Sequence, residues 1–391
     1  MDLRFGDEDA RFRIEVRSWL EQNVPTTPRP ADAAGAREWD LAWQRTQYEG
    51  GWGGIAWPVE YGGQGLPLVR QLIWFEEYAL AGGPDIGCCF VGMNHGGPTL
   101  IVRGSEEQKL RHLPKIIRGE EVWCQGFSEP GAGSDLAGIS TRARIDGDEL
   151  VVNGQKIWTS FAHMADFQEL LVRTDPESSR HKGLTWVICD MHSPGITVRP
   201  ITGMDGDSDF CEVFYDDVRI PLDNVVGKLG DGWSVAMSTL GFERGTGFMK
   251  SQTELSRLLE RLIEIAAVLP SPTGHDGTAL ADPSIAGRLG ELRADVAAMR
   301  AMTYATVSTA ARTDVPGPEG SLIKAFYGDL SQRIHRIGMD ILGTAGLDRG
   351  GRFAKEISAY LYSYASTIGG GTSEVQRDII GERILGLPRN R

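Results

Sequence analysis

One stretch of this chain places hydroxyl groups beside bare glycines, a combination that suits a ligand-binding turn. It reads W-C-Q-G-F-S-E-P-G-A-G-S-D-L-A-G over residues 123–138, with Ser128 and Ser134 on either side of a Pro-Gly-Ala-Gly turn. Because glycine has no Cβ, its backbone N–H groups can come close to a ligand, and such amides suit an anion or the edge of a heterocycle. The stretch therefore predicts a ligand-binding turn.

A second stretch adds an aromatic ring and two more hydroxyls. It reads N-G-Q-K-I-W-T-S over residues 153–160 and ends in Trp158, Thr159 and Ser160. Alternating apolar and polar residues on both sides of the dipeptide at 146–147, Asp-Gly, predict two strands joined by a tight turn. The indole and its neighbouring hydroxyls are therefore expected on a β-hairpin.

The elements that position these stretches change character twice along the chain. Residues 12–20 form a helical apolar stripe, and Ser105 with Gln108 makes a capping box that predicts a helix. From about residue 121 short apolar runs bounded by Gly, Pro, Asp or Ser predict six to eight strands. The pattern is helical again in four segments, 233–268, 284–312, 319–342 and 353–385. This order favours an α+β architecture with separate layers.

Composition excludes several classes of protein. The formal net charge of −13 over 391 residues argues against broad binding to nucleic acid or to an acidic membrane. The five cysteines form no metal-like spacing and are expected to be reduced core thiols, so no metal site is predicted. No signal peptide and no membrane-spanning run is seen, so a cytoplasmic protein is expected. No G-x-G-x-x-G follows a strand, so a nucleotide would bind on a non-Rossmann scaffold.

Motifs in several regions together resemble the acyl-CoA dehydrogenase family. They comprise the two stretches above, G-S-E-E-Q-K-x-R-x-L-P-x-I-x-R-G-E before them, and D-D-V-R-I-P with N-V-V-G-K and the closing G-G-T-S-E-V-Q-R-D-I-I-G-E-R-I-L-G-L-P-R after them. The resemblance implies an N-terminal helical domain at 1–120, a central β-barrel-like or sandwich domain at 121–228, and a C-terminal four-helix bundle at 229–391. It also implies oxidation of an acyl-CoA thioester between its α and β carbons, with FAD as cofactor.

The resemblance assigns flavin contacts to both stretches. A lone tryptophan on a hairpin would normally indicate packing, but its place in the family's W-x-T/S pattern favours a position beside the flavin ring. Ser134 is expected near the pyrophosphate or the thioester ligand. The expected contacts are Gln125, Phe127, Ser128, Gly133, Ser134, Trp158, Thr159 and Ser160.

Two C-terminal segments resemble those that meet the adenosine part of FAD. Asp340 and Gly343 lie in D-I-L-G-T-A-G, where the family has Q-x-x-G-G-x-G; Asp340 replaces the usual Gln, and Thr344 replaces the second Gly. Thr372 and Glu374 lie in G-G-T-S-E. All except Thr344 are expected cofactor contacts.

The catalytic base is the point at which the family divides. Many members place a Glu immediately before the G-T of the last motif, where this chain has Gly370. A second group places its Glu on the first helix of the bundle in an L-x-x-E-R pattern, and Leu240 to Arg244 match that pattern. Glu243 is therefore the expected base, and Arg244 is expected beside the CoA portion of the substrate. His95 and His163 receive no role.

One family motif is missing. R-x-x-F-G, whose Arg clamps FAD from a neighbouring subunit, is absent between residues 269 and 293. In its L-G-L-P-R ending and its interrupted helix, the chain resembles an actinobacterial type of relative that splits the FAD site between unlike subunits. A homo- or hetero-oligomer with a related subunit is expected, with electron-transfer flavoprotein or a similar acceptor as redox partner.

Three functions stay open at this level. The first is desaturation in fatty acid or sterol side-chain degradation, on a CoA or carrier-protein thioester. The second is a flavin oxidase or monooxygenase on the same fold, and the third is a non-catalytic partner subunit. The length and branching of the acyl group are not indicated.

Overall fold

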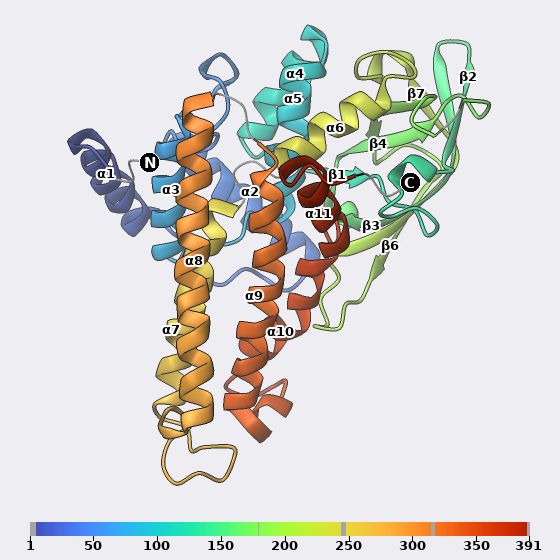
Figure 1. The fold of residues 1–391 in the computed structure, drawn as a ribbon. Helices are drawn as coiled ribbons and strands as arrows, with labels where there is room; N and C mark the ends of the chain where they lie inside the picture. Colours follow the sequence, from blue (N-terminus) through green and yellow to red (C-terminus); the bar gives the residue numbers. More distant parts are fainter. Residues whose placement is uncertain (1–4, 179, 244–247, 314–316, 389–391) are drawn as a thin grey trace.

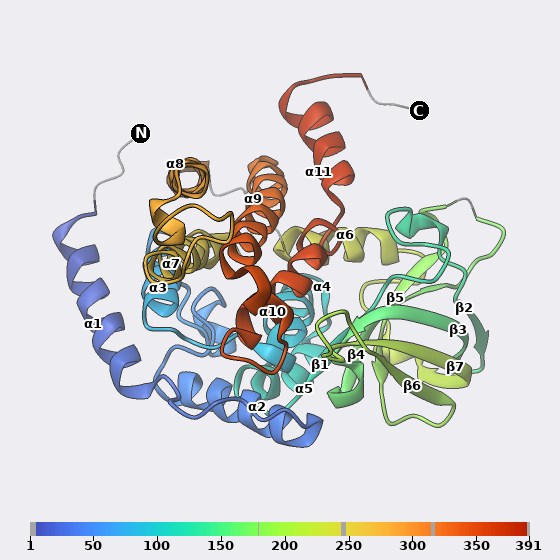
Figure 2. The same ribbon diagram turned by 90° about the horizontal axis from the view of Figure 1, so that it is seen from below.

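The chain forms a helical N-terminal part, a central sheet and a C-terminal helical bundle in that order (Figure 1). The structure is a computed structural model that describes residues 5–178, 180–243, 248–313 and 317–388, without the side chains of residues 243, 248, 312 and 313. In both views the sheet lies to one side of the helices (Figure 2). The predicted α+β layering is confirmed.

The N-terminal part owes its helices to amphipathic stripes and caps. Phe12, Val16 and Leu20 are buried on one face of the first helix, as their spacing predicts. The capping box of Ser105 and Gln108 is present, with reciprocal hydrogen bonds of 3.2 and 3.0 Å. The helices are α1 (Asp7–Asn23), α2 (Ala33–Glu49), α3 (Leu68–Leu80), α4 (Gly97–Arg103) and α5 (Glu106–Ile117).

The central sheet has seven strands, within the predicted range. The strands are β1 (Trp123–Gly126), β2 (Arg142–Asp146), β3 (Glu149–Ser160), β4 (Phe167–Arg173), β5 (Leu184–Asp190), β6 (Ile196–Ile201) and β7 (Phe210–Pro221). Their order is β1-β4-β2-β3-β7-β6, with β5 added to β4. The predicted hairpin is confirmed as β2 paired antiparallel with β3 across the Asp-Gly turn.

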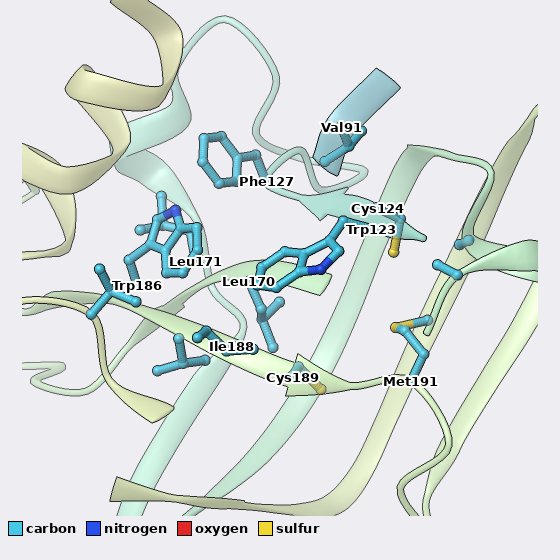
Figure 3. Close-up of a cluster of buried hydrophobic side chains, with 14 of the residues drawn as sticks. Val91, Trp123, Cys124, Phe127, Leu170, Leu171, Trp186, Ile188, Cys189 and Met191 are labelled. Atoms are coloured by element: carbon cyan, nitrogen blue, oxygen red, sulfur yellow. The ribbon is translucent and has the colours of Figure 1, made fainter. Parts of the chain in front are cut away.

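The principal core lies between this sheet and the helices beside it. Trp123, Leu170 and Trp186 contribute fully buried side chains from three strands (Figure 3). Phe127 and Val91 close the cluster from the segment after β1 and from the region before α4. All five cysteines are buried and free, which confirms the expectation of reduced core thiols.

The C-terminal bundle is built from α7 (Phe248–Ala266), α8 (Pro283–Thr313), α9 (Glu319–Leu342) and α10 (Ala354–Tyr362), preceded by α6 (Gly232–Glu243). The predicted last segment, 353–385, is not one helix. It breaks after α10, and α11 (Ser373–Ile379) starts at a Thr372 cap. α10 passes into a 3-10 turn at Ser363–Thr367, and Gly370 and Gly371, with positive φ values of 66° and 89°, then keep the chain from returning to a helix before the cap.

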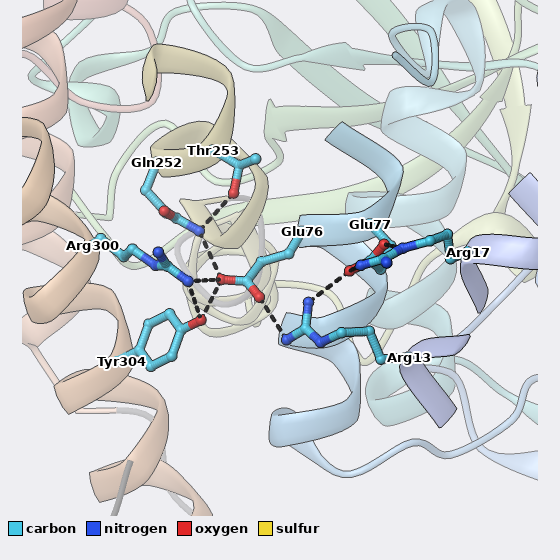
Figure 4. A network of polar contacts seen from close by, with 8 residues as sticks. All are labelled: Arg13, Arg17, Glu76, Glu77, Gln252, Thr253, Arg300 and Tyr304. Carbon is cyan, nitrogen blue, oxygen red and sulfur yellow. Dashed lines mark hydrogen bonds and ion pairs between the residues drawn. The ribbon is translucent and has the colours of Figure 1, made fainter. Parts of the chain in front are cut away.

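A cluster of buried charge joins the N-terminal helices to the bundle. Glu76 on α3 contacts Arg13 of α1 at 2.8 Å, Arg300 of α8 at 3.7 Å and Gln252 of α7 at 3.2 Å (Figure 4). Tyr304 of α8 also donates to the Glu76 carboxylate. We call this group, with Glu77, Arg17 and Thr253, the Glu76 cluster.

None of the helices in the described ranges combines the length and the apolar character that a membrane-spanning segment needs.

Candidate active site

The structure brings the two predicted ligand-binding stretches together. Ile157 of β3 donates its backbone N–H to the carbonyl of Ser128 at 2.9 Å. The buried ammonium of Lys156 donates to the carbonyl of Phe127 at 3.0 Å. Since both bonds join the segment after β1 to the end of β3, the two stretches form one surface. We call residues 125–134 with residues 158–160 the platform.

An ion pair supports the platform from inside the protein. Lys156 Nζ lies 2.9 Å from the Glu129 carboxylate, and the two side chains are 0 % and 4 % exposed. Glu129 also accepts hydrogen bonds from Ser140 N, Ser140 Oγ and Thr141 N at 2.6–2.8 Å. Burial alone raises the pKa of Glu129, but the Lys156 charge and these donors outweigh it and lower the pKa to about 2. The carboxylate therefore stays ionised and holds the turn in place.

Burial disfavours the charged form of Lys156 more than its partner compensates. Its burial lowers the pKa to about 8, despite the opposing effect of Glu129. The pair is thus a charge-assisted anchor that depends on both partners. Removal of one partner would leave a buried charge without compensation.

Trp158 stands out of the strand because of an irregularity in the sheet. The pairing of β3 with β7 shifts register between Lys156 and Thr159, and Trp158 has a φ of 61°. Its indole is 58 % exposed and meets Phe210 edge-on at 6.2 Å between ring centroids. A bulky residue in the left-handed region carries a conformational cost, and such strain concentrates at functional sites. The bulge therefore leaves the indole exposed at the end of β3.

The turn of the first stretch is tight and open on its outer side. Glu129 and Ala132 exchange backbone hydrogen bonds of 2.9 and 3.0 Å. A Cβ built on Gly131 or on Gly133 would meet nothing within 4 Å, and Ser134 is exposed. Free space over backbone amides is what an approaching ligand requires.

A buried histidine and a buried carboxylate hold the amide of Gln125. Gln125 Nε2 donates to Glu169 Oε1 at 2.7 Å and lies 3.2 Å from His95 Nδ1. His95 and Glu169 are 3 % and 0 % exposed. The side-chain amide of Gln125 is therefore fixed through its nitrogen.

A large cavity lies among the N-terminal helices and the helices of the C-terminal bundle. Its volume is about 680 Å³, and it is walled by segments of α3, α4, α6, α7, α8 and the start of α9. Asn94 lines it from a π-helical turn, Gly92–Gly96, in which the next residue is His95. Because His95 contacts Gln125, adjacent residues of one turn serve the cavity and the platform.

The predicted base lies at the end of a helix on the cavity wall. α6 ends at Glu243, and the two preceding residues, Gly241 and Phe242, line the cavity. A hydrogen bond of 2.9 Å between Thr99 Oγ1 and Thr239 Oγ1 fixes α6 against α4. The Glu243 side chain and Arg244, the predicted CoA contact, lie outside the described residues.

The predicted adenosine contacts are not brought to the platform. Asp340 is paired with Arg288 at 2.7 Å, and Gly343 ends α9 with a φ of 51°. Thr372 caps α11, and Glu374 is exposed. Among the described residues no hydrogen bond, ion pair or ring contact joins these four to the platform, so their roles stay predictions.

Sequence reasoning missed the residues that hold the platform from behind. Lys156 follows the buried Leu150 and Val152 at an even spacing along β3, so the sequence alone could have indicated a buried lysine. Glu169 and Glu129 gave no local signal, because their partners are up to 44 residues away.

Comparison with known proteins identifies the family of the chain. Three family profiles match in order: the acyl-CoA dehydrogenase N-terminal domain at residues 6–120, its middle domain at 124–218 and its C-terminal domain at 230–385. The acyl-CoA dehydrogenase IpdE1 of Mycobacterium tuberculosis is 40 % identical over 386 residues, which cover 97 % of each chain.

Solved structures share the whole fold. A chain of the "Tcur3481-Tcur3483 steroid ACAD" is 33 % identical with a TM-score of 0.87, and the match covers 100 % of both chains. A chain of the ChsE4-ChsE5 complex from Mycobacterium tuberculosis is also 33 % identical, with a TM-score of 0.85 over 100 % of both chains. The chain therefore belongs to the acyl-CoA dehydrogenase family, oxidoreductases that act on CH–CH bonds.

Proposed function

We propose that the protein catalyses FAD-dependent α,β-dehydrogenation of an acyl-CoA thioester, with Glu243 as the base that removes the α proton. The observation that carries this proposal is the cavity of about 680 Å³ whose wall includes Gly241 and Phe242, immediately before Glu243. Pockets for organic ligands commonly measure about 300–1,000 Å³. An acyl group in this cavity would lie beside the helix end that carries the carboxylate.

The platform fits a flavin. Its turn offers backbone amides over open space at Gly131 and Gly133, and Trp158 offers an exposed ring face. Ser134 is exposed and Ser160 is partly exposed, so these two residues can offer hydroxyls to a polar heteroaromatic ligand, whereas Thr159 is fully buried. When bound, the flavin supplies the hydride acceptor.

The residues of this chain would perform the other steps. Glu243 would accept the α proton, and the surrounding apolar side chains would exclude water and so strengthen electrostatic interactions inside the site. Gln125, held by Glu169 and His95, would present a fixed amide to the cofactor. Ser134 and Arg244 would contact the pyrophosphate, thioester or CoA portion of the ligands.

Partner subunits and redox partners follow from the relatives. The ChsE4-ChsE5 complex contains two kinds of subunit. We infer that this chain also associates with a copy of itself or with a related subunit, and passes electrons to electron-transfer flavoprotein or a similar acceptor. The steroid ACAD relative supports a sterol-derived or other bulky acyl substrate.

A second candidate is the non-catalytic subunit of such a complex. Two observations favour it: R-x-x-F-G is absent from residues 269–293, and the Asp340 carboxylate is engaged with Arg288 inside the chain. Both weaken the adenosine side of the cofactor site in this chain taken alone.

The deciding experiment is an anaerobic visible spectrum of the purified protein during titration with acyl-CoA thioesters. Loss of the oxidised flavin band with one class of thioester is expected from the dehydrogenase. Reduced flavin that reacts with oxygen instead of an electron-transfer protein would identify an oxidase or monooxygenase. A colourless protein that takes up no FAD, alone or with a related subunit, would contradict the proposal.

A further inference from the structure

The cavity is apolar over most of its wall but contains one group of charges. Lys250 Nζ lies 2.9 Å from an oxygen of Asp85 and 2.8 Å from an oxygen of Glu254. These three, which we call the Lys250 triad, are the charged side chains that line the cavity in the described ranges. Asp85 follows α3, whereas the other two belong to α7, so the triad forms where two elements meet.

The two carboxylates, rather than the ammonium, are the open members of the triad. The Lys250 side chain is 17 % exposed and its ammonium lies 5.6 Å from the centre of the Tyr78 ring. The Glu254 and Asp85 side chains are 40 % and 94 % exposed. The triad therefore presents its carboxylate oxygens more openly than its ammonium group.

Three other polar side chains on the cavity wall are occupied within the protein, whereas Gln71, which donates to the carbonyl of Leu66, has a side-chain oxygen without a partner in the described residues. Gln44 donates to the carbonyls of Gly53 and Ile117, both at 2.9 Å. Tyr78 accepts from Trp43 and donates to the carbonyl of Pro84, both at 2.7 Å. Thr303 donates to the carbonyl of Met299 at 3.0 Å. The triad differs because it places two carboxylates, each with one oxygen that has no partner among the described residues, beside an ammonium donor.

The net charge of the triad selects the chemistry of its ligand. One ammonium and two carboxylates sum to a formal charge of −1, so an anionic group on the acyl chain would be repelled. A plain hydrocarbon would displace water from the free carboxylate oxygens without replacing its hydrogen bonds. A hydroxyl can donate to a carboxylate and accept from an ammonium at the same time.

We propose that the Lys250 triad is a specificity site for a hydroxyl group on the acyl portion of the substrate, away from the thioester. The inference rests on the proposed function, since it assumes that the acyl group occupies this cavity. Lys250 follows Glu243 by seven residues, which limits their separation to roughly 25 Å at full extension. The cavity of about 680 Å³ leaves room for a ring that carries the hydroxyl.

The test compares three kinds of thioester that differ in one group on the ring. They are 3-cyclohexylpropanoyl-CoA, its 4-hydroxy derivative and its 4-carboxy derivative. Each of the two derivatives is measured as its cis and its trans isomer. Affinity is measured by calorimetry on the flavin-loaded protein, with any partner chain that it needs. Glu243→Gln is present throughout to prevent turnover. One hydroxy isomer is expected to bind at least about 10-fold more tightly than the unsubstituted thioester, since hydrogen bonds to charged groups contribute about 1.5–3 kcal/mol. The carboxy derivative is expected to bind most weakly.

Charge reversal sharpens the test. Asp85→Asn with Glu254→Gln changes the formal charge of the triad from −1 to +1, so the carboxy derivative should become the tightest ligand while the unsubstituted thioester keeps its affinity. Asp85→Asn alone changes the most exposed member of the triad. It should give thioester affinities between those of the unaltered triad and those of the double variant. Glu264→Gln, an exposed change on α7 that does not line the cavity, should leave the order unchanged.

The outcomes separate the two proposals. Equal affinity for the hydroxy and unsubstituted thioesters, before any change to the triad, would overturn the specificity site and leave dehydrogenation intact. Absence of binding by all three, together with no flavin bleaching by any acyl-CoA, would instead overturn the proposed function.

Discussion

Two clusters of charged side chains around buried carboxylates connect parts of this protein, and they differ in what they join. The Glu129–Lys156 pair lies within the central sheet, between residues 27 positions apart, and its lysine is fully buried. Hydrogen bonds of the Glu76 cluster join residues up to 228 positions apart in the sequence, and its arginines Arg13 and Arg300 are 23 % and 61 % exposed. The first cluster supports the platform from one domain. The second connects the helices that surround the cavity.

This difference separates the two halves of the site physically. The platform depends on strand register and one local ion pair, so its shape is intrinsic to the sheet. The cavity depends on how α3, α7 and α8 assemble, so its shape depends on contacts across the whole chain. Perturbation of the Glu129–Lys156 pair should therefore lower the affinity for flavin and not that for acyl-CoA. Perturbation of the Glu76 cluster should lower the affinity for acyl-CoA and not that for flavin.

The largest effect is expected from a change outside both clusters. Glu243→Gln should slow flavin reduction by an acyl-CoA by about 10²- to 10⁴-fold, the usual contribution of a general base. Flavin content and the free energy of unfolding should stay unchanged. Anaerobic stopped-flow measures the rate, with Glu264→Gln as the matched control on α7. A rate equal to that of the unaltered protein would remove Glu243 from the mechanism.

The next largest effect tests the local pair. Lys156→Met leaves the Glu129 carboxylate buried without its cation and should lower the free energy of unfolding by about 3–5 kcal/mol. Urea unfolding measures this, and flavin affinity should fall with it. Adding Glu129→Met should recover much of the stability, because no charge is then left alone. A loss under about 1 kcal/mol in the single variant would show that the pair does not stabilise the platform.

Acid should reveal the same pair without Lys156 being changed. The pKa of Glu129 falls from an ordinary 4.5 to about 2 on folding, so its contribution is complete above about pH 4.5 and is lost as pH falls toward 2. The loss should reach the order of 3 kcal/mol. As the pH falls from 6 to 2, the difference in urea midpoint between the unaltered protein and Glu129→Gln should shrink toward zero. A difference that stays constant with pH would contradict the assignment of this pH dependence to Glu129.

A smaller effect is expected from the cluster between domains. Glu76→Gln should cost about 1–3 kcal/mol of stability, since it weakens bonds to Arg13 and Arg300 without removing the side chain. Acyl-CoA affinity should fall while flavin content stays constant. Release of flavin by this variant would mean that the platform also depends on the junction, and the comparison would fail.

The smallest effect concerns the strained indole. Trp158→Gly should be more stable than Trp158→Ala by about 1 kcal/mol, because glycine adopts the φ of 61° without strain. Both variants should lose flavin affinity, since both lack the exposed ring. Equal stability of the two in urea would show that the bulge relaxes when the side chain is shortened.

The same division explains what could be predicted from the sequence. The hairpin of β2 and β3 and the cap at Ser105 are local, so alternation and the Asp-Gly turn predicted them correctly. The break between α10 and α11 was missed, because its Gly-Gly pair was interpreted only as part of a motif. Pairs of distant charges, such as Asp85 with Lys250, depend on tertiary assembly and have no local signal.

The π-helical turn of residues 92–96 has a practical consequence for protein engineering. Asn94 faces the cavity while its neighbour His95 contacts Gln125 of the platform. A mutant library designed to broaden substrate range at Asn94 would also disturb the side-chain amide of Gln125, which we propose as a cofactor contact. Such a library should be screened first for the yellow colour of retained flavin and only then for turnover, so that loss of cofactor is not mistaken for altered specificity.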